Sequence, residues 1–335
     1  MKVLLYSEGK SLFNVSGVGR ALKHQMEALD LAGVDFTLDP KDEYDIAHVN
    51  TVGILSEKVI KQAKKRNKKV IVHTHTTYED FKNSFILSNQ LAPILKKRLI
   101  NIYKMADLLI SPSEYTKHLI QSYGIKNPIE VVSNGVDTNK FNCEKFKEKN
   151  FKKNLNLKGP LILSVGLPFE RKGILDFYKL AKELPYYNFV WVGAKLNVIP
   201  KRIKKILKNE LPNLLFPGFL SDEMLMSAFC EADIFLFPSY EENEGIVVLE
   251  ALSSKTPLII RDIPVYNNWL KHGENCLKSK NLEDFINNIN SIINKNINVE
   301  KLRENGRKIA EERDLKIIGL KLKKIYGDIY EKKEK

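Results

Sequence analysis

The stretch Pro238–Ala251, PSYEENEGIVVLEA, determines how the rest of the chain is interpreted. The apolar run before it predicts a buried strand that ends in a polar turn, and Gly245 marks the start of a helix. Glu242 then lies in the turn and Glu250 in the second turn of the helix, with seven residues between them. The first amides of such a helix lack an intrahelical partner and suit an anion. Here they belong to Gly245, Ile246 and Val247.

Two carboxylates on either side of an anion site match one class of ligand. A nucleotide sugar carries hydroxyl groups at both ends of a diphosphate, so each carboxylate could bind one end. A capped helix after a solvated acidic turn would show the same residues without any ligand. This stretch alone leaves both interpretations open.

The composition is that of an ordinary globular protein, with 43% hydrophobic and 28% charged residues. A chain of 335 residues is longer than a single hydrophobic core usually accommodates, so we expect two domains. No apolar run approaches the ~18 residues that span a bilayer, and the start, MKVLLYSEGK, predicts a first strand rather than a signal peptide. The cysteines are odd in number, scattered and without metal-ligand spacing, which fits a reducing cytosol. They are Cys143, Cys230 and Cys276.

The net charge of +13 is compatible with nucleic acid, anionic lipid or phosphorylated substrates as partners. A compositional bias toward Lys would produce it as well. Lys58–Lys69 holds seven basic residues and no acid. Leu91–Met105 places apolar residues at helical spacing beside four basic ones, which suits a helix on a membrane surface or one packed on a sheet. Since no recognition motif is present, we expect no nucleic-acid partner.

Short apolar runs alternate with amphipathic stretches twice along the chain, which predicts parallel sheets covered on both faces. We expect two doubly wound domains, 1–150 and 151–314, with the polar stretch Asn142–Lys153 as linker and a final helix over 315–330 that can pack back on the first domain. Ligands bind beyond the carboxyl ends of such strands, so a cleft between the domains is expected to hold the site. The predicted strands are Val3–Tyr6, Ile46–Val49, Val70–His73, Leu108–Ile110, Ile129–Val132, Leu161–Val165, Phe189–Val192, Leu214–Phe216, Ile234–Phe237 and Leu258–Ile260.

Three loops after predicted strands carry further candidates. In SGVGR, Gly17 and Gly19 open a helix and allow backbone to approach a phosphate, although a tight turn would need the same glycines. In VGLPFERKG, Arg171 and Lys172 could neutralise a departing diphosphate or could form a solvated charged turn. In PGF, the backbone at Gly218 could bind a flat base.

The segment HTHTTYEDF follows the third predicted strand. We expect His73 and His75 to point to opposite faces of the strand end, so that only one faces the cleft and the two do not share a metal ion. A neutral histidine there could donate a hydrogen bond to a sugar hydroxyl. A capping or core histidine is the alternative.

Taken together, these motifs resemble the retaining glycosyltransferases of family 4, which have the GT-B fold of two Rossmann-like domains facing across a cleft. PSYEENEGIVVLEA is similar to their Glu–seven–Glu motif, and SGVGR, HTHTTYEDF, SNGVD, the VG…KG loop and PGF follow in the family's order over nearly the whole chain. More narrowly, MKVLLYSEG, HTHTTYEDFKNSF and SYEENEGIVVLEAL resemble the bacterial enzymes that build glucosyl- and galactosylglucosyl-diacylglycerol.

The resemblance implies a role for each matching residue. Glu242 would contact the donor sugar and Glu250 the ribose, while Lys172 would bind the diphosphate. His75 matches the histidine near the sugar, with His73 as the alternative. The family often carries Arg where this chain has Leu167, and Arg171 is the candidate to replace it. The diphosphate would also meet the amides of Gly17, Gly19, Gly245, Ile246 and Val247.

The activity implied is transfer of a hexose, glucose or galactose, from a UDP-sugar to a lipid acceptor, diacylglycerol or monoglucosyl-diacylglycerol, with retention of configuration. Fixed cations and helix ends would stabilise the leaving diphosphate without a metal or cofactor. The protein would work in the cytoplasm, peripheral to the anionic inner face of the cell membrane. The same chemistry on a soluble or polysaccharide acceptor remains open, as does a non-catalytic nucleotide-sugar-binding protein.

Overall fold

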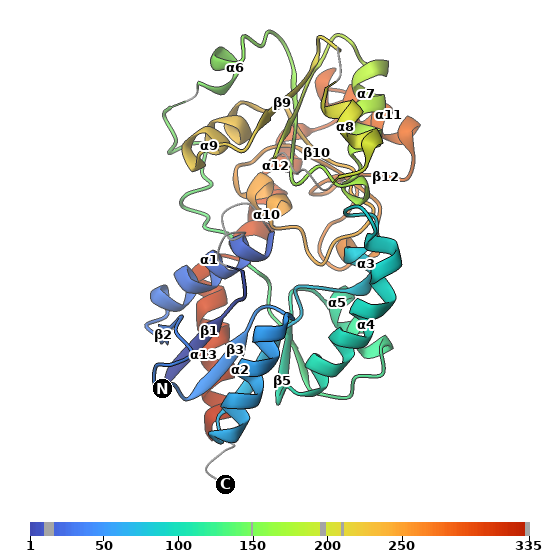
Figure 1. The fold of residues 1–335 in the computed structure, drawn as a ribbon. Helices are drawn as coiled ribbons and strands as arrows, with labels where there is room; N and C mark the ends of the chain where they lie inside the picture. Colours follow the sequence, from blue (N-terminus) through green and yellow to red (C-terminus); the bar gives the residue numbers. More distant parts are fainter. Residues whose placement is uncertain (10–16, 149, 195–198, 209–210, 332–335) are drawn as a thin grey trace. The chain divides into compact units, whose positions relative to one another are not determined.

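The chain forms two compact units in the computed structural model, which describes residues 1–9, 17–148, 150–194, 199–208 and 211–331 (Figure 1). The first unit comprises Met1–Phe81, Asn89–Gly135 and Arg313–Lys335, and the second comprises Lys82–Ser88 and Val136–Glu312. The chain thus leaves the first unit earlier than residue 150, and the stretch 142–153, expected as a linker, lies within the second unit.

The first unit is built on a parallel sheet of six strands in the order β2-β1-β3-β4-β5-β6. Its order reverses between β1 and β3, which pair in parallel although β2 lies between them in the sequence. The strands are β1 (Lys2–Tyr6), β2 (Asp35–Thr37), β3 (Ile46–Val49), β4 (Lys69–His73), β5 (Leu108–Ser111) and β6 (Ile129–Val131).

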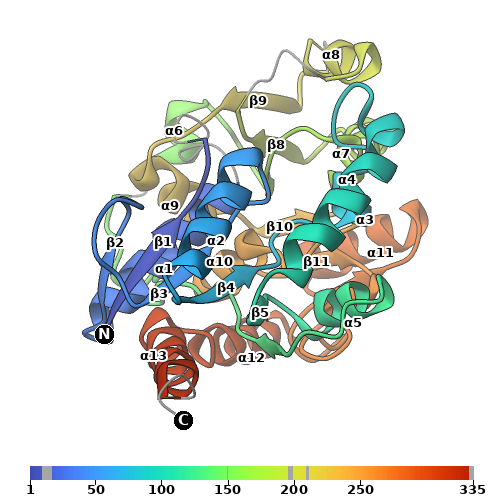
Figure 2. The same cartoon turned by 60° about the horizontal axis from the view of Figure 1, so that its bottom comes forward.

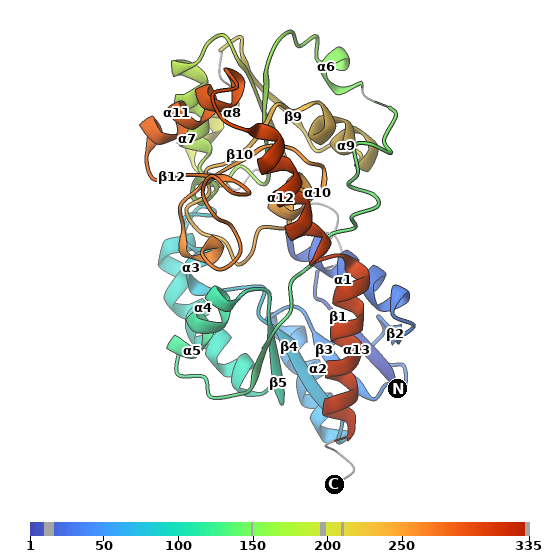
Figure 3. The same cartoon turned by 180° about the vertical axis from the view of Figure 1, so that it is seen from behind.

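Helices cover both faces of this sheet because its central strands are apolar on both sides. Against one face pack α1 (Gly17–Leu31) and the C-terminal helix α13 (Leu315–Glu331), which run side by side (Figure 3). Against the other face pack α2 (Ile54–Lys65), α4 (Ser88–Lys104) and α5 (Glu114–Ser122) (Figure 2). A short helix, α3 (Tyr78–Phe81), follows β4.

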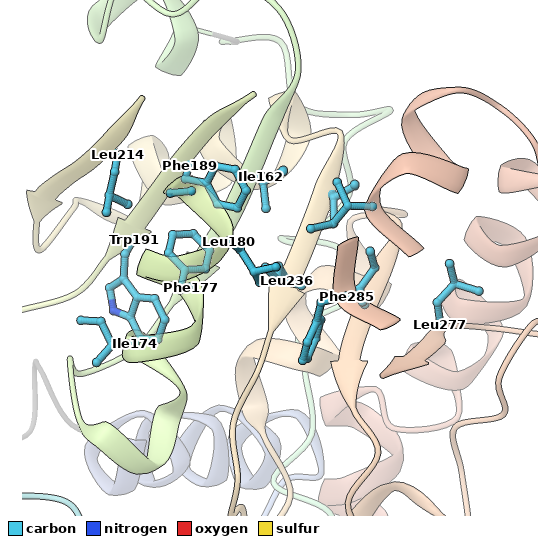
Figure 4. Packing of buried hydrophobic residues seen from close by; sticks show 14 of the residues in the cluster. Ile162, Ile174, Phe177, Leu180, Phe189, Trp191, Leu214, Leu236, Leu277 and Phe285 are labelled. Atoms are coloured by element: carbon cyan, nitrogen blue, oxygen red, sulfur yellow. The ribbon is translucent and has the colours of Figure 1, made fainter. Parts of the chain in front are cut away.

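The second unit repeats the plan with the strand order β12-β11-β10-β7-β8-β9, all parallel. Its core on one face includes Phe177, which meets the rings of Phe189 and Trp191 edge-on (Figure 4). The strands are β7 (Leu161–Val165), β8 (Asn188–Val192), β9 (Leu214–Gly218), β10 (Ile234–Phe237), β11 (Leu258–Arg261) and β12 (Leu277–Ser279). The helices are α6 (Phe151–Asn154), α7 (Ile174–Glu183), α8 (Lys201–Leu207), α9 (Asp222–Glu231), α10 (Ile246–Ser253), α11 (Leu282–Ile293) and α12 (Val299–Glu311).

The prediction of two doubly wound parallel sheets is confirmed, and each predicted strand is present. The sequence pattern missed β2 and β12. Both are three-residue strands at the edge of a sheet, and an edge strand needs no continuous apolar run because it is not covered on all sides.

A disulfide joins Cys143, in the stretch expected as a linker, to Cys230 on α9. The spacing of the cysteines did not predict this pair, which is 87 residues apart. Since disulfides are rare in reducing compartments, this bond weighs against the expectation of a reducing cytosol. The third cysteine, Cys276, is a buried free thiol, and burial raises its pKa to about 12.

Candidate functional site

The order of the second sheet explains where its polar loops meet. The chain starts at β7, builds β8 and β9 to one side, and returns to place β10 on the other side of β7. The connections after β7 and β10 therefore run in opposite directions from one edge of the sheet. Ligands of doubly wound sheets bind at the carboxyl ends of the strands at such a switch point. The loop after β7 carries Arg171 and Lys172, and the loop after β10 carries Glu242.

Lys172 and Glu242 form an ion pair across the switch point. The ammonium nitrogen of Lys172 lies 2.5 Å from Oε1 of Glu242, and only 16% and 6% of the two side chains are exposed. The hydroxyl of Ser239 also donates to this carboxylate oxygen, at 2.6 Å. An ion pair this enclosed is held in one geometry rather than exchanged with solvent, so both charges have fixed positions.

Gly173 allows the two loops to approach each other. A Cβ atom at this residue would lie 2.2 Å from the carbonyl oxygen of Pro238, and its φ of +80° is one that other residues rarely adopt. Any side chain here would push the turn that carries Glu242 away from Lys172.

Arg171 lies beside the same pair. Its Nη1 is 3.9 Å from Oε1 of Glu242 and 3.2 Å from the carbonyl oxygen of Glu241, to which it donates. Its Nε donates to Oγ of Ser84 at 2.8 Å. Leu167, where the related motif often carries arginine, instead packs against the apolar core. The structure therefore brings Arg171, Lys172 and Glu242 together.

Helix α10 begins where the sequence pattern placed it. Its N-cap is Gly245, which has the left-handed φ of +94°, and the first helical hydrogen bonds run from the amides of Val248 and Leu249 back to the Gly245 carbonyl. The amides of Ile246 and Val247 precede these bonds, at the positive end of the helix. Glu250 lies one turn further along and is fully buried.

Three residues that the sequence pattern did not reveal hold the acidic turn in place. Nη2 of Arg261, at the end of β11, lies 2.5 Å from Oδ2 of Asp176, and its Nε donates to the carbonyl of Pro238 at 3.0 Å. The ring of Tyr240 lies 3.8 Å from the guanidinium carbon, and its hydroxyl donates to Asp176 at 2.5 Å. Burial and the bond to Asp176 raise the pKa of Tyr240. A charged residue at the end of an apolar strand was the signal that could have identified Arg261.

Gly218 ends β9 at the same edge of the sheet. Its carbonyl accepts a hydrogen bond from the amide of Gly193 at 3.0 Å, and the amide of Gly166 donates to Val192 at 2.8 Å. Gly166 and Gly193 directly follow β7 and β8, and Gly218 ends β9, so three neighbouring strands bring glycine backbone to this edge. Flat groups can approach the main chain there.

In the first unit, His73 and His75 share one face, and the expectation of opposite faces is wrong. Their rings are stacked with centroids 3.7 Å apart, and the ring of His48 on β3 is stacked with that of His73 at 5.4 Å. Side chains alternate along a strand, so residues two apart point the same way. Nε2 of His75 is hydrogen-bonded to Oδ1 of Asn50 at 3.1 Å. Burial lowers the pKa of His75 to about 3, so its ring is neutral near pH 7.

The remaining predicted positions also lie in the first unit. Gly17 and Gly19 occupy the first turn of α1, and Ser16 of the same motif lies outside the described residues. Within the described ranges, no three His, Cys, Asp or Glu side chains converge to hold a metal ion.

The basic and amphipathic stretches divide between core and surface. On α4, Leu99 and Ile102 are fully buried, whereas Leu91 and Ile94 are exposed by 45% and 67%. At the start of α2, Ile54 is exposed by 66%. Arg98, in the second half of α4, donates to the carbonyl of Val52 at 2.7 Å, so α4 contacts the residues just before α2. No helix in the described part of the chain is both long and apolar enough to cross a bilayer.

Each half of the chain matches a known family model. Residues 36–140 match the model described as Glycosyltransferase Family 4, and residues 145–309 match Glycosyl transferases group 1. The chain is 42% identical over 333 residues to the processive diacylglycerol alpha-glucosyltransferase of Acholeplasma laidlawii, covering 98% of both chains. It is 27% identical over 261 residues to the alpha-galactosylglucosyldiacylglycerol synthase of Streptococcus pneumoniae, covering 75% of this chain and 70% of the relative.

Solved structures share the fold over almost the whole chain. The sucrose-phosphate synthase of Thermosynechococcus elongatus superposes with a TM-score of 0.83 at 19% identity, covering 98% of this chain and 99% of its own. Anabaena HepE, solved in complex with UDP and glucose, has a TM-score of 0.79 at 16% identity, covering 98% of this chain and 100% of its own. The predicted GT-B class is confirmed.

Proposed function

The chain belongs to the family 4 glycosyltransferases, and we propose that it transfers a hexose from a UDP-sugar to a diacylglycerol lipid with retention of configuration. The observation that carries the proposal is the 42% identity along 98% of the chain to a diacylglycerol alpha-glucosyltransferase. The enclosed Lys172–Glu242 pair at the switch point supports it. Glucose is therefore the first sugar to test, and galactose the second.

The second unit would bind the donor. In this proposal the diphosphate meets the amides of Ile246 and Val247 at the positive end of α10, a favourable place for an anion. Lys172 exchanges the carboxylate of Glu242 for a phosphate oxygen, which frees Glu242 to accept hydrogen bonds from the sugar hydroxyls. Glu250 binds the ribose, and the base lies against the backbone near Gly218.

The reaction needs stabilisation of negative charge on the leaving diphosphate. As the bond between the sugar and the phosphate breaks, charge builds on the phosphate while the sugar becomes oxocarbenium-like. Lys172 and Arg171 are fixed cations beside this position, and fixed charges need no reorganisation as the reaction proceeds. The acceptor hydroxyl then attacks from the face that the diphosphate leaves, which retains configuration, and passes its proton to the departing phosphate oxygen. These protein charges would act without a metal ion.

The first unit would supply the acceptor side. His75, neutral and fixed by Asn50 and by stacking on His73, is the candidate to hydrogen-bond the sugar. Gly17 and Gly19, in the first turn of α1, are the candidates of this unit to bind a phosphate.

The proposed acceptor is a diacylglycerol lipid in a membrane, so the protein would have to contact the membrane surface to reach it. Leu91 and Ile94 near the start of α4 and Ile54 at the start of α2 are exposed apolar residues. Lys64 and Lys65 are exposed in the last turn of α2, and Lys97 is exposed on α4. Exposed apolar side chains together with exposed lysines are typical of proteins that bind anionic lipid surfaces without spanning them. We place the protein at the inner face of the cell membrane. The Cys143–Cys230 disulfide is unusual for a reducing compartment. Thiol titration of the isolated protein tests whether the bond forms.

The test is an acceptor screen with the purified protein. UDP-glucose and UDP-galactose are each offered with diacylglycerol, monoglucosyl-diacylglycerol and water-soluble sugars, and products are identified by mass spectrometry and by the anomeric coupling constant. An alpha-linked glycolipid supports the proposal. Transfer to soluble acceptors alone, or a beta-linked product, contradicts it.

A further inference from the structure

A short segment from the first half of the chain is built into the second unit. Residues Lys82–Ser88, here called the strap, belong to the second unit, although the residues before and after them belong to the first. The ring of Phe85 packs edge-on against that of Phe169, in the loop after β7. The strap therefore meets the loop that carries Arg171 and Lys172.

Arg171 is attached to the strap through both its backbone and its side chain. Its amide donates to the carbonyl of Asn83 at 3.1 Å, and its Nε donates to Oγ of Ser84 at 2.8 Å. The carbonyl of Arg171 accepts the amide of Tyr240 at 2.7 Å, in the turn before Glu242. One residue thus connects the strap to the acidic turn.

Ser84 acts as an acceptor in this contact. The residue is buried, with 4% exposed, and its hydroxyl has the carbonyl of Lys82 within reach as an acceptor at 3.5 Å. The hydroxyl oxygen accepts from Nε of Arg171 at 2.8 Å and so holds the guanidinium on one side. Nη1 is then left at 3.2 Å from the Glu241 carbonyl and 3.9 Å from Oε1 of Glu242.

We propose that Ser84 is a positioning residue, which holds the Arg171 guanidinium beside Lys172 and keeps it from closing onto Glu242. The proposal rests on the proposed function, in which Arg171 stabilises the leaving diphosphate. A buried guanidinium without its hydroxyl partner would turn toward the nearest carboxylate, because an enclosed charge seeks a charged partner. Glu242 is that carboxylate, and it would then compete with the diphosphate for Arg171.

The geometry separates this role from a purely structural one. The strap is also held by the Asn83 carbonyl and by the Phe85–Phe169 contact. Ser84→Ala removes one acceptor and leaves those two contacts, so the strap is expected to stay in place. Ser88→Ala is the matched control, since Ser88 is also buried in the strap. The hydrogen bond described for Ser88 runs from its backbone amide to the carbonyl of Phe85, and alanine keeps that amide.

The experiment measures kcat and the KM for the UDP-sugar in Ser84→Ala, Ser84→Thr and Ser88→Ala. A lost hydrogen bond to a charged group predicts a fall in kcat of about tenfold in Ser84→Ala, with KM changed by less than about threefold. Ser84→Thr keeps the oxygen and should recover most of kcat, and Ser88→Ala should match the parent. Equal kcat values in Ser84→Ala and Ser88→Ala would overturn the proposal.

A double-mutant cycle identifies the residue through which Ser84 acts. In the Arg171→Ala background, Ser84→Ala should lower kcat no further, because the residue it positions is gone. An equal loss in both backgrounds overturns the proposal. A normal kcat in Arg171→Ala removes Arg171 from the reaction and overturns it too, while the transferase assignment stands. Failure of the proposed function itself is distinct, since the unmodified protein would then transfer no sugar to any acceptor.

Discussion

The ammonium of Lys172 and the carboxylate of Glu242 meet at 2.5 Å, although the two residues are 70 positions apart in the sequence. They meet because β7 and β10 are neighbours in the sheet and their loops leave it at the same edge. Lys172 also lies 5.3 Å from the ring centroid of Phe237, which shields it from solvent on one side. A cation and an anion fixed in this way can bind the two parts of a sugar nucleotide: the cation its phosphates and the anion its hydroxyl groups.

Glu242→Ala and Lys172→Ala should each lower turnover at least about 100-fold, the scale of one lost electrostatic partner at a developing charge. Glu250→Ala should mainly raise the KM for the donor, because a ribose contact is made equally in ground and transition states. Steady-state kinetics with varied UDP-sugar distinguish the two effects. Near-normal turnover in Glu242→Ala would remove the acidic turn from the active site.

Activity should persist without a divalent metal ion, since Lys172, Arg171 and the start of α10 supply the positive charge. The measurement is the initial rate after dialysis against EDTA, with and without added magnesium or manganese. Complete loss in EDTA that either ion restores would contradict this prediction.

Binding to liposomes that contain phosphatidylglycerol should depend on the basic residues of the first unit. Each lysine near an anionic surface contributes roughly 1 kcal/mol, and salt screens the attraction. Reversing Lys64, Lys65 and Lys97 to Glu should therefore reduce sedimentation with these liposomes and transfer to lipid, but leave UDP-sugar affinity unchanged.

The matched control for the membrane test reverses Lys204, Lys205 and Lys208, which lie in the second unit and are also exposed. These substitutions change the net charge equally and should not affect sedimentation. If both triple variants behave alike, or if neutral and anionic liposomes bind the parent equally, the surface assignment fails.

Stability should fall as the pH drops from about 6.5 toward about 3, because burial lowers the pKa of His48 from 6.5 to about 3. The unfolded chain takes up a proton on His48 in this window while the folded chain does not, so this contribution to stability is complete above pH 6.5. At pH 5.5 the loss amounts to about 1.4 kcal/mol for one histidine. Urea unfolding across pH measures it.

His48→Gln should reduce the slope of this pH dependence without abolishing it. The unfolded chain then gains no proton at that position, but His75, whose pKa burial also lowers, still contributes. His118→Gln, on the exposed side of α5, is the control and should keep the parent's slope. An unchanged slope in His48→Gln would show that other groups are responsible.

The disulfide should stabilise the second unit. Cys143→Ser combined with Cys230→Ser is expected to lower the free energy of unfolding by about 2–4 kcal/mol, since the crosslink restricts the unfolded chain. Thiol titration of the denatured, unreduced protein should find one free thiol, that of Cys276. Three reactive thiols in protein isolated without reductant would show that the bond does not form.

The sequence by itself determined the two doubly wound sheets, the start of α10 at Gly245 and the family. These features depend on local pattern: apolar runs of strand length, a glycine where a helix begins, and residues at fixed spacing within one loop and helix. Such patterns are set by backbone conformation and burial of neighbouring residues, which are encoded within a few turns of chain. The same locality explains why the short edge strands β2 and β12, with little apolar pattern, went undetected.

Only the tertiary structure decided which distant residues meet. Arg261 contacts Asp176 across 85 positions, Ser84 contacts Arg171 across 87, and His48 contacts Tyr326 across 278. The disulfide and the stacking of His48 on His73 are of the same kind. No local pattern specifies these partners, because the packing of whole strands and helices brings them together. The chain therefore shows where its charged loops lie along the sequence, and the order of strands in the sheet determines which of them form a site.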